Sequence, residues 1–235
     1  MNQVIALAFF MTISIGSFGA ETQSLFNGTD LTGWTQATGS ASYEVEPGLN
    51  GAPASILGKT IQNDSVNSFL VTEDTYSDFI LEYEFKVDSN LNSGVQFRSF
   101  INSNNRVQGY QSEIDPSSRA WSGGLFEEQG RGWLNDLSNN AAARSAFVAN
   151  EWNHIKIRAE GTHIQTWING VQAVDYVEKN PAIPTEGFIG LQVHTEPQAD
   201  LEVRWRNLNL IQIPEPSSLV LLSLGGLLIT RRRRG

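Results

Sequence analysis

Hydrophobic and polar residues alternate with a period of two along most of the segment 43–211. In the stretch 78–87 the apolar side chains fall on one face and the charged side chains on the other. The apolar positions are Leu81, Tyr83, Phe85 and Val87, and the charged positions are Glu82, Glu84 and Lys86. Because successive side chains of a β-strand point to opposite faces, this alternation predicts a strand with one buried face.

The same pattern predicts further strands over 93–100, 187–195 and 201–213, and a hairpin over 152–172 with a turn at Glu160-Gly161. Asn169-Gly170 is a further tight-turn signal. Helical periodicity is confined to 141–149. Repeated short strands separated by turn signals predict an all-β chain folded as a two-sheet sandwich or jelly roll.

The N-terminal segment 1–20 has a different composition from the predicted sandwich. An apolar run over 4–15 is followed by small residues, with Ser17 and Gly19 well placed for cleavage after Gly19. This order predicts a secretory signal peptide, although no Lys or Arg precedes the apolar run. A buried strand or a membrane anchor is the alternative.

The C-terminal segment 213–235 has three parts in order. Pro214 and Pro216 flank Glu215, an apolar run covers 219–229, and four arginines occupy 231–234. These parts resemble the PEP-CTERM sorting signal of Gram-negative bacteria. The resemblance implies a transient membrane segment, processing by an exosortase-type peptidase, and a final location in the periplasm, at the outer surface or in the extracellular matrix. A tail anchor is the alternative, although the apolar run is shorter than a bilayer span requires.

Between these ends, residues 21–212 form the predicted folded domain and are strongly acidic. The whole chain has 16 basic and 25 acidic residues. Setting aside arginines 231–234 and Glu215 leaves 12 basic and 24 acidic residues in the domain. This excess argues against nucleic acid as a partner and is compatible with a neutral ligand such as a sugar. The chain has no cysteine, which excludes disulfides and thiolate metal sites.

Polar side chains gather on the predicted strands opposite the apolar faces. Gln111, Glu113 and Asp115 share one face, Gln96 shares a face with Arg98, and Gln192 shares one with His194. On a curved sheet, these three strands can bring their polar faces together in a groove. The alternative is the ordinary solvated face of an antiparallel sheet.

Aromatic side chains near this polar set indicate the kind of ligand. Trp121, Phe126 and Trp133 occur in the second half of the stretch 109–133. Flat aromatic rings pack well against the C–H faces of a pyranose, so the sequence favours a carbohydrate. A divalent metal bound by Glu113, Asp115 and His194 is chemically reasonable, but the spacing of these residues is not a recognised metal motif.

Seven segments of the chain, taken together and in order, resemble one known family. They are SLFNGTDLTGW (24–34), DFILEYEFKV (78–87), NSGVQFRS (92–99), GYQSEIDPSSRAWSGGLFEEQGRGW (109–133), EWNHIKIRAEGTHIQTWING (151–170), GFIGLQVH (187–194) and VRWRNL (203–208). The set resembles the 3-keto-disaccharide hydrolase domain family and covers about residues 24–211. The resemblance implies a concanavalin-like jelly-roll sandwich that cleaves the glycosidic bond of a sugar oxidised to a ketone at C3.

The resemblance also implies roles for individual residues. Asp115, His194 and Glu113 are candidates for proton transfer, with Asp115 and His194 preferred because family members carry an amide where Glu113 stands. Arg98 is the candidate for stabilising negative charge. The candidate sugar-binding residues are Asn92, Gln111, Trp121, Arg131 and Trp133.

Two other functions are compatible with parts of the same sequence. A laminarinase-like endoglucanase would carry the carboxylate motif E-x-D-x-x-E, but Ser118 stands where the third carboxylate belongs. A non-catalytic carbohydrate-binding module displayed at the cell surface would need the aromatic and amide side chains but no catalytic base.

Overall fold

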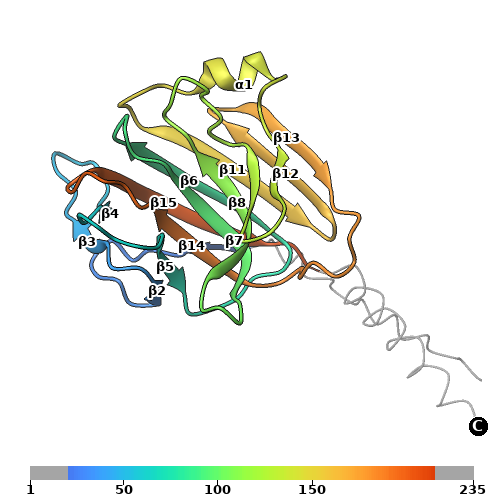
Figure 1. The fold of residues 1–235 in the computed structure, drawn as a ribbon, viewed down its shortest axis with the longest axis horizontal. Helices are drawn as coiled ribbons and strands as arrows, with labels where there is room; N and C mark the ends of the chain where they lie inside the picture. Colours follow the sequence, from blue (N-terminus) through green and yellow to red (C-terminus); the bar gives the residue numbers. More distant parts are fainter. Residues whose placement is uncertain (1–20, 215–235) are drawn as a thin grey trace, which may run out of the picture.

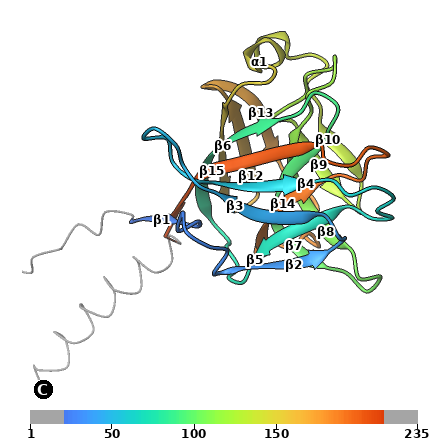
Figure 2. The ribbon, with the colours of Figure 1, turned by 90° about the vertical axis from the view of Figure 1, so that its left-hand side faces the viewer.

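Two antiparallel β-sheets pack against each other in the computed structural model, which describes residues 21–214 (Figure 1). The eight-stranded sheet has the order β13-β12-β11-β6-β15-β4-β3, with β1 added to β15. Its strands are β1 (Thr22–Ser24), β3 (Ser42–Glu46), β4 (Ser55–Lys59), β6 (Phe79–Val87), β11 (Asn153–Glu160), β12 (His163–Ile168), β13 (Val171–Val177) and β15 (Glu202–Gln212). Figure 2 shows β6, β15, β4 and β3 side by side in this sheet.

The seven-stranded sheet has the order β10-β9-β8-β7-β14-β5-β2. Its strands are β2 (Trp34–Thr38), β5 (Ser68–Thr72), β7 (Ser93–Ile101), β8 (Val107–Ile114), β9 (Leu125–Glu128), β10 (Gly132–Asn135) and β14 (Phe188–Val193). Strands β7 to β10 are neighbours in chain order, but β14 lies between β7 and β5, so strands distant in the sequence pair in the middle of the sheet, as in a jelly roll. The all-β sandwich predicted from the sequence is therefore confirmed.

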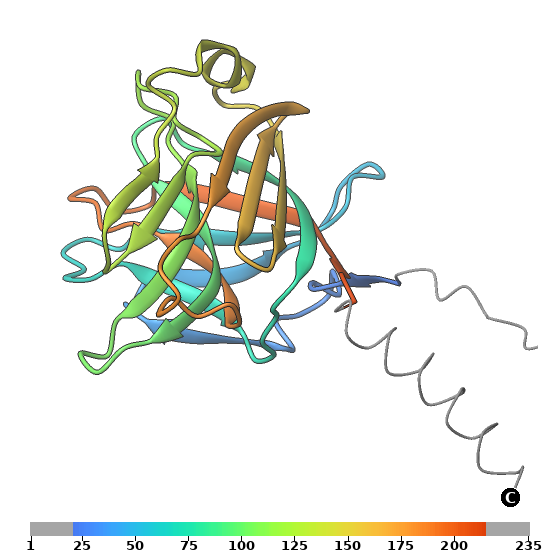
Figure 3. The same ribbon diagram turned by 90° about the vertical axis from the view of Figure 1, so that its right-hand side faces the viewer.

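The predicted alternation determines which side chains form the core between the sheets. The apolar residues of β6 are buried while its charged residues are partly exposed. The hairpin of β11 and β12 likewise buries Ile155, Ile157, Ile164 and Ile168 completely. Helix α1 (Ala141–Ala146) lies within the predicted helical segment. It sits at one end of the sandwich, next to β12 and β13 (Figure 3).

The central strands of the seven-stranded sheet depart from simple alternation because both of their faces are buried. Gln96 on β7, Gln111 on β8 and Gln192 on β14 are each at most 2% exposed, although they point away from the apolar core. The polar face of this sheet is therefore not an ordinary solvated surface. Its amides must find hydrogen-bond partners within the protein or in a ligand.

The two ends of the described chain lie side by side, because β1 pairs with β15 and Thr22 lies opposite Ile211. The predicted signal peptide and most of the predicted sorting tail lie outside the described residues. Within residues 21–214, no helix has the length and apolar character needed to cross a membrane.

Candidate functional site

A cavity of about 700 Å³ opens over the polar face of the seven-stranded sheet. Six of the nine site residues predicted from the sequence line it: Asn92, Gln111, Glu113, Asp115, Trp133 and His194. Phe126 and Gln192 line it as well. The structure therefore places Asp115 and His194, which come from different strands, around a single hollow.

The strand register explains why these residues meet. Gly94 on β7 pairs with Glu113 on β8 and with Gln192 on β14, so the three positions form one row across the sheet. A Cβ atom on Gly94 would lie 2.4 Å from Cδ of Gln111, closer than real side-chain contacts permit. The glycine therefore leaves the space in which Gln111 lies across β7 toward Gln192.

Side-chain amides form a directed chain of hydrogen bonds that ends at Glu113. The Ser99 hydroxyl donates to Gln96 Oε1 (2.8 Å), and Gln96 Nε2 donates to Gln111 Oε1 (2.5 Å). Gln111 Nε2 then donates to Glu113 Oε2 (2.9 Å) and to Gln192 Oε1 (3.2 Å). Because each amide oxygen is already an acceptor, the Gln111 amide presents its N–H groups to the carboxylate.

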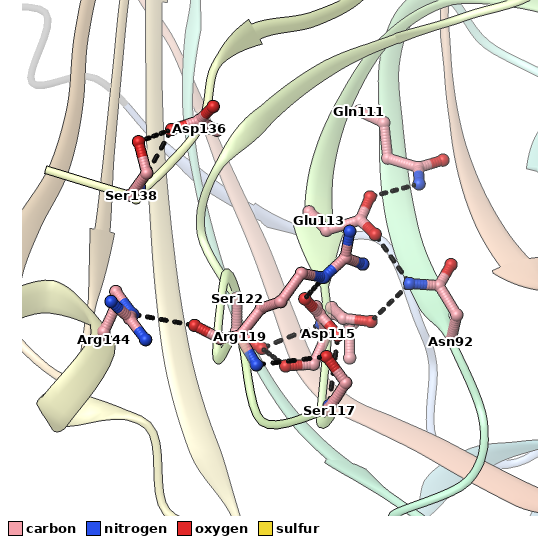
Figure 4. A network of polar contacts seen from close by, with 11 residues as sticks. Asn92, Gln111, Glu113, Asp115, Ser117, Arg119, Ser122, Asp136, Ser138 and Arg144 are labelled. Atoms are coloured by element: carbon pink, nitrogen blue, oxygen red, sulfur yellow. Dashed lines mark hydrogen bonds and ion pairs between the residues drawn. The ribbon is translucent and has the colours of Figure 1, made fainter. Parts of the chain in front are cut away.

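Glu113 is a buried carboxylate that accepts hydrogen bonds on both oxygens. Asn92 Nδ2 donates to its Oε1 at 2.6 Å, opposite the bond from Gln111 (Figure 4). Burial, with a smaller contribution from the nearby charge of Asp115, raises the pKa of Glu113 to about 7. The two amide hydrogen bonds lower the pKa but do not offset the effect of burial. A carboxylate with this pKa can accept and release a proton at neutral pH.

Replacing Gln111 by Met tests this hydrogen-bond chain, because Met has a similar volume but no N–H donor. Loss of one donor to the carboxylate should raise the pKa of Glu113 further above its ordinary value. NMR titration of ¹³C-labelled glutamate side chains measures this directly. Gln192→Met is the matched control, since it removes a partner of Gln111 but no donor to Glu113. Equal pKa values in both variants and the wild type would contradict the proposed influence of Gln111.

Asp115 lies just after β8 and is held by the loop that follows. Its Oδ1 accepts the Ser117 backbone N–H at 3.1 Å, and its Oδ2 accepts Nε of Arg119 at 3.0 Å (Figure 4). The Arg119 guanidinium also lies 4.8 Å from the ring centre of Trp121 and 5.9 Å from that of Trp133.

Arg119 is a functional candidate that the sequence analysis missed. Its side chain is 49% exposed and lines the cavity, and within residues 21–214 its Nη atoms make no hydrogen bond. It therefore places a positive charge and free donors beside Glu113 and Asp115. The only sequence signal was its place four residues after Asp115 in a loop rich in small polar residues.

His194 follows β14 and enters the cavity from the side opposite to β9. Its Nδ1 lies 2.8 Å from the Thr195 carbonyl oxygen and 3.1 Å from Oε1 of Glu196. Because both neighbours are acceptors, Nδ1 carries a proton. Nε2 makes no hydrogen bond to any residue of the described chain, which leaves it for proton exchange with a ligand.

The predicted placement of Arg98 in the site is wrong. A β-bulge shifts the register between Phe97 and Phe100, and Arg98 takes a positive φ of 48°. The bulge turns its side chain away from the face of Gln96. Arg98 is instead buried, donating to the carbonyl oxygens of Ser77 and Gly161 and to Oδ1 of Asp78.

Arg131 and Trp121 also lie outside the cavity lining. Arg131 pairs with the buried carboxylates Glu127 and Glu178, so its guanidinium joins the β9–β10 turn to the segment after β13. Trp121 contacts the ring of Trp133 edge-on, with 4.9 Å between ring centres. Neither residue lines the cavity, which corrects their predicted role as sugar contacts.

The metal alternative does not fit the observed geometry. Among the residues that the structure describes, no three His, Asp or Glu side chains converge closely enough to hold a metal ion. Glu113 and Asp115 have their oxygens engaged by amide and guanidinium donors, which are the wrong neighbours for a cation.

Comparison with known families gives two matches that together span nearly the whole chain. Residues 21–211 match the model of the 3-keto-alpha-glucoside-1,2-lyase-like domain. Residues 212–234 match the PEP-CTERM protein-sorting motif. Both matches agree with the resemblances seen in the sequence. No curated protein matches the chain.

Solved structures with the same fold have low sequence identity to this chain. A glycosyl hydrolase candidate from Parabacteroides distasonis is 19% identical with a TM-score of 0.56, covering 82% of this chain and 94% of its own. The carbohydrate binding module CBM66 from Bacillus subtilis is 19% identical with a TM-score of 0.56, covering 77% and 96%. A Bacillus subtilis protein of unknown function with a galectin-like fold is 11% identical with a TM-score of 0.59, covering 82% and 94%. At these identities the likeness establishes the fold alone.

Proposed function

Because this chain belongs to the 3-keto-alpha-glucoside-1,2-lyase-like domain family, we propose that it cleaves the glycosidic bond of 3-keto-glycosides by acid–base chemistry in the cavity over the seven-stranded sheet. The observation that carries the proposal is Glu113, a buried carboxylate whose pKa of about 7 suits a general base. The cation of Arg119 and the aromatic ring of Trp133 lie on the same cavity.

The chemistry of a 3-keto sugar defines what the site must supply. A ketone at C3 acidifies the C2–H bond, so a base can remove that proton and leave an enolate whose charge rests on the C3 oxygen. Collapse of the enolate forms a C1=C2 double bond and expels the C1 oxygen, which takes a proton from an acid. Water then adds its hydroxyl to C1 and its proton to C2, so the net reaction is hydrolysis.

Each requirement has a candidate in the cavity. Glu113 takes the C2 proton, because it combines burial with a pKa near neutrality. The free Nη donors of Arg119 stabilise the enolate oxygen, the role that the sequence analysis gave to Arg98. When both ring nitrogens of His194 carry a proton, His194 gives the Nε2 proton to the leaving oxygen and keeps the Nδ1 proton. Asp115 holds Arg119 in place.

The sorting motif at 212–234 indicates an exported protein with a C-terminal sorting signal, which supports a proposed site of action outside the cytoplasm. We propose processing by an exosortase-type peptidase after transient membrane association. A final site in the periplasm, at the outer surface or in the extracellular matrix would expose the cavity to extracellular glycosides.

A carbohydrate-binding module without activity is the second candidate. The aromatic side chains favour it, because Phe126 and Trp133 contact each other edge-on with 5.3 Å between ring centres and both line the cavity. Such a surface can bind a sugar without any base.

Incubation of the purified protein with a 3-keto-glucoside, with and without a chelator, separates these candidates. Release of the aglycone from the keto sugar but not from the unoxidised glucoside is the expected result, because only the ketone acidifies C2–H. Binding of both sugars without release of aglycone from either would instead support the binding module. Activity that disappears with the chelator would require a metal in the mechanism.

A further inference from the structure

Glu128 at the end of β9 is a buried carboxylate that the proposed reaction does not use. It shares a strand face with Phe126, lines the same cavity as Glu113, and is 8% exposed. In the register of β8 and β9, Glu128 pairs with Gly109 while Phe126 pairs with Gln111. Glu128 therefore lies further along the sheet than the amide chain that reaches Glu113.

Glu128 is the most weakly partnered of the five buried carboxylates of the described chain. The other four each accept hydrogen bonds: Glu113 from two amides, Asp115 from Ser117 and Arg119, and Glu127 and Glu178 from Arg131. Within residues 21–214, the Glu128 carboxylate has no ion pair, and its hydrogen-bonding neighbours are the neutral side chains of Gln129 and Asn67. Its oxygens are not sealed from the cavity, so they can also accept a hydrogen bond from a ligand there.

The surroundings of Glu128 indicate what the ligand must offer. Burial raises the pKa of Glu128, while a hydrogen bond with Gln129, the nearby His194 and a hydrogen bond with Asn67 lower it. Arg106 lines the small hollow behind Glu128 but does not pair with it. Glu196 adds a second carboxylate to the cavity wall. This end of the cavity therefore carries two carboxylates, and neither forms an ion pair with a Lys or Arg side chain of the described chain.

We infer that Glu128 forms a second ligand subsite, which accepts hydrogen bonds from a hydroxyl or ammonium group of the bound sugar and rejects a carboxylate. The inference rests on the proposed function only in taking the ligand to be a sugar. It adds a recognition group, Glu128, which lies near His194 and on a different strand from the proposed base Glu113. Neutral and amino sugars are then accepted, and uronic acids are excluded by charge.

Binding of three probes to the full-length protein tests the subsite: methyl glucoside, methyl glucosaminide and methyl glucuronide, each titrated by NMR. The wild type should bind the neutral and aminated probes and bind the glucuronide at least tenfold more weakly. Glu128→Gln keeps the shape but removes the charge. This variant should lower the preference for the glucosaminide over the glucoside about fivefold and relax the exclusion of the glucuronide.

The control is Glu82→Gln, which removes the same charge from β6 of the eight-stranded sheet, where the side chain is 46% exposed. Its probe preferences should equal those of the wild type. A preference for the glucosaminide over the glucoside would identify ammonium as the favoured group, and the reverse order would identify hydroxyl. Unchanged preferences in Glu128→Gln, or binding of none of the probes, would overturn the inference. Because the readout is binding, it stands whether or not the protein cleaves 3-keto-glucosides.

Discussion

The Glu113→Gln variant is expected to release the aglycone of a 3-keto-glucoside about 100- to 10,000-fold more slowly than the wild type. The amide keeps the size of the side chain but cannot take the C2 proton. In the wild type the base must be ionised, so the rate should rise with pH and level off above the pKa of about 7. The pH dependence of aglycone release measures both effects, with Glu82→Gln as the control for charge alone.

Retention of more than a tenth of the wild-type rate in Glu113→Gln would assign the base elsewhere. Asp115→Asn and His194→Ala then become the informative variants, because these are the remaining proton-transfer candidates in the cavity. If one of them loses turnover while still binding sugar, that residue takes the role proposed for Glu113.

Although Glu113→Gln should lower the reaction rate, it should raise the stability of the fold. A slow but stable variant shows that chemistry, and not folding, has been lost. Burial raises the folded-state pKa of Glu113 from 4.5 to about 7. The folded state therefore holds the proton more tightly than the unfolded state, and wild-type stability falls as pH rises from about 4.5 to about 7. Above that range the ionised Glu113 costs the fold on the order of 3 kcal/mol. Urea unfolding should show Glu113→Gln gaining stability relative to the wild type between pH 5 and pH 8.

The sequence was sufficient to predict the fold because burial follows side-chain periodicity directly. The alternation in β6 and in the β11–β12 hairpin specifies which faces meet, and Asn169-Gly170 ends the second strand of that hairpin. The convergence of Glu113 and Gln192 was predictable for a related reason. On each strand an apolar residue next to this position points to the core, so the side chain itself points to the other, polar face of the sheet.

Three features of the site were not predictable because they depend on departures from regular structure or on distant partners. A bulge reverses the direction of Arg98, and a period of two cannot reveal an inserted residue. Arg131 forms an ion pair with Glu178, which lies 47 positions away in the sequence. Glu128 follows Glu127 directly, and only the structure shows that one is paired and the other faces the cavity.

Replacement of Arg98 by Met is expected to destabilise the fold by about 3–5 kcal/mol, the range for removing one partner of a buried ion pair. The Arg98 side chain is 1% exposed, and its loss removes the donors to the carbonyl oxygens of Ser77 and Gly161 and leaves Asp78 without its counter-charge. Asp78 Oδ1 then keeps only the Gly161 backbone N–H, at 2.9 Å. Urea unfolding measures the change. Arg158→Met is the matched control, because this arginine is 36% exposed and pairs with Glu160 on the surface, where an ion pair contributes under about 1 kcal/mol.

A second substitution distinguishes the structural role of Arg98 from the catalytic role that the sequence suggested. Adding Asp78→Asn to Arg98→Met removes the uncompensated charge and should recover part of the lost stability, although the two carbonyl oxygens stay unpaired. At a temperature where the single variant is fully folded, its rate of 3-keto-glucoside cleavage should stay within about twofold of the wild type, because Arg98 lies outside the cavity. A large loss of rate without loss of stability would return Arg98 to the reaction and would require the bulge in β7 to open when the substrate binds.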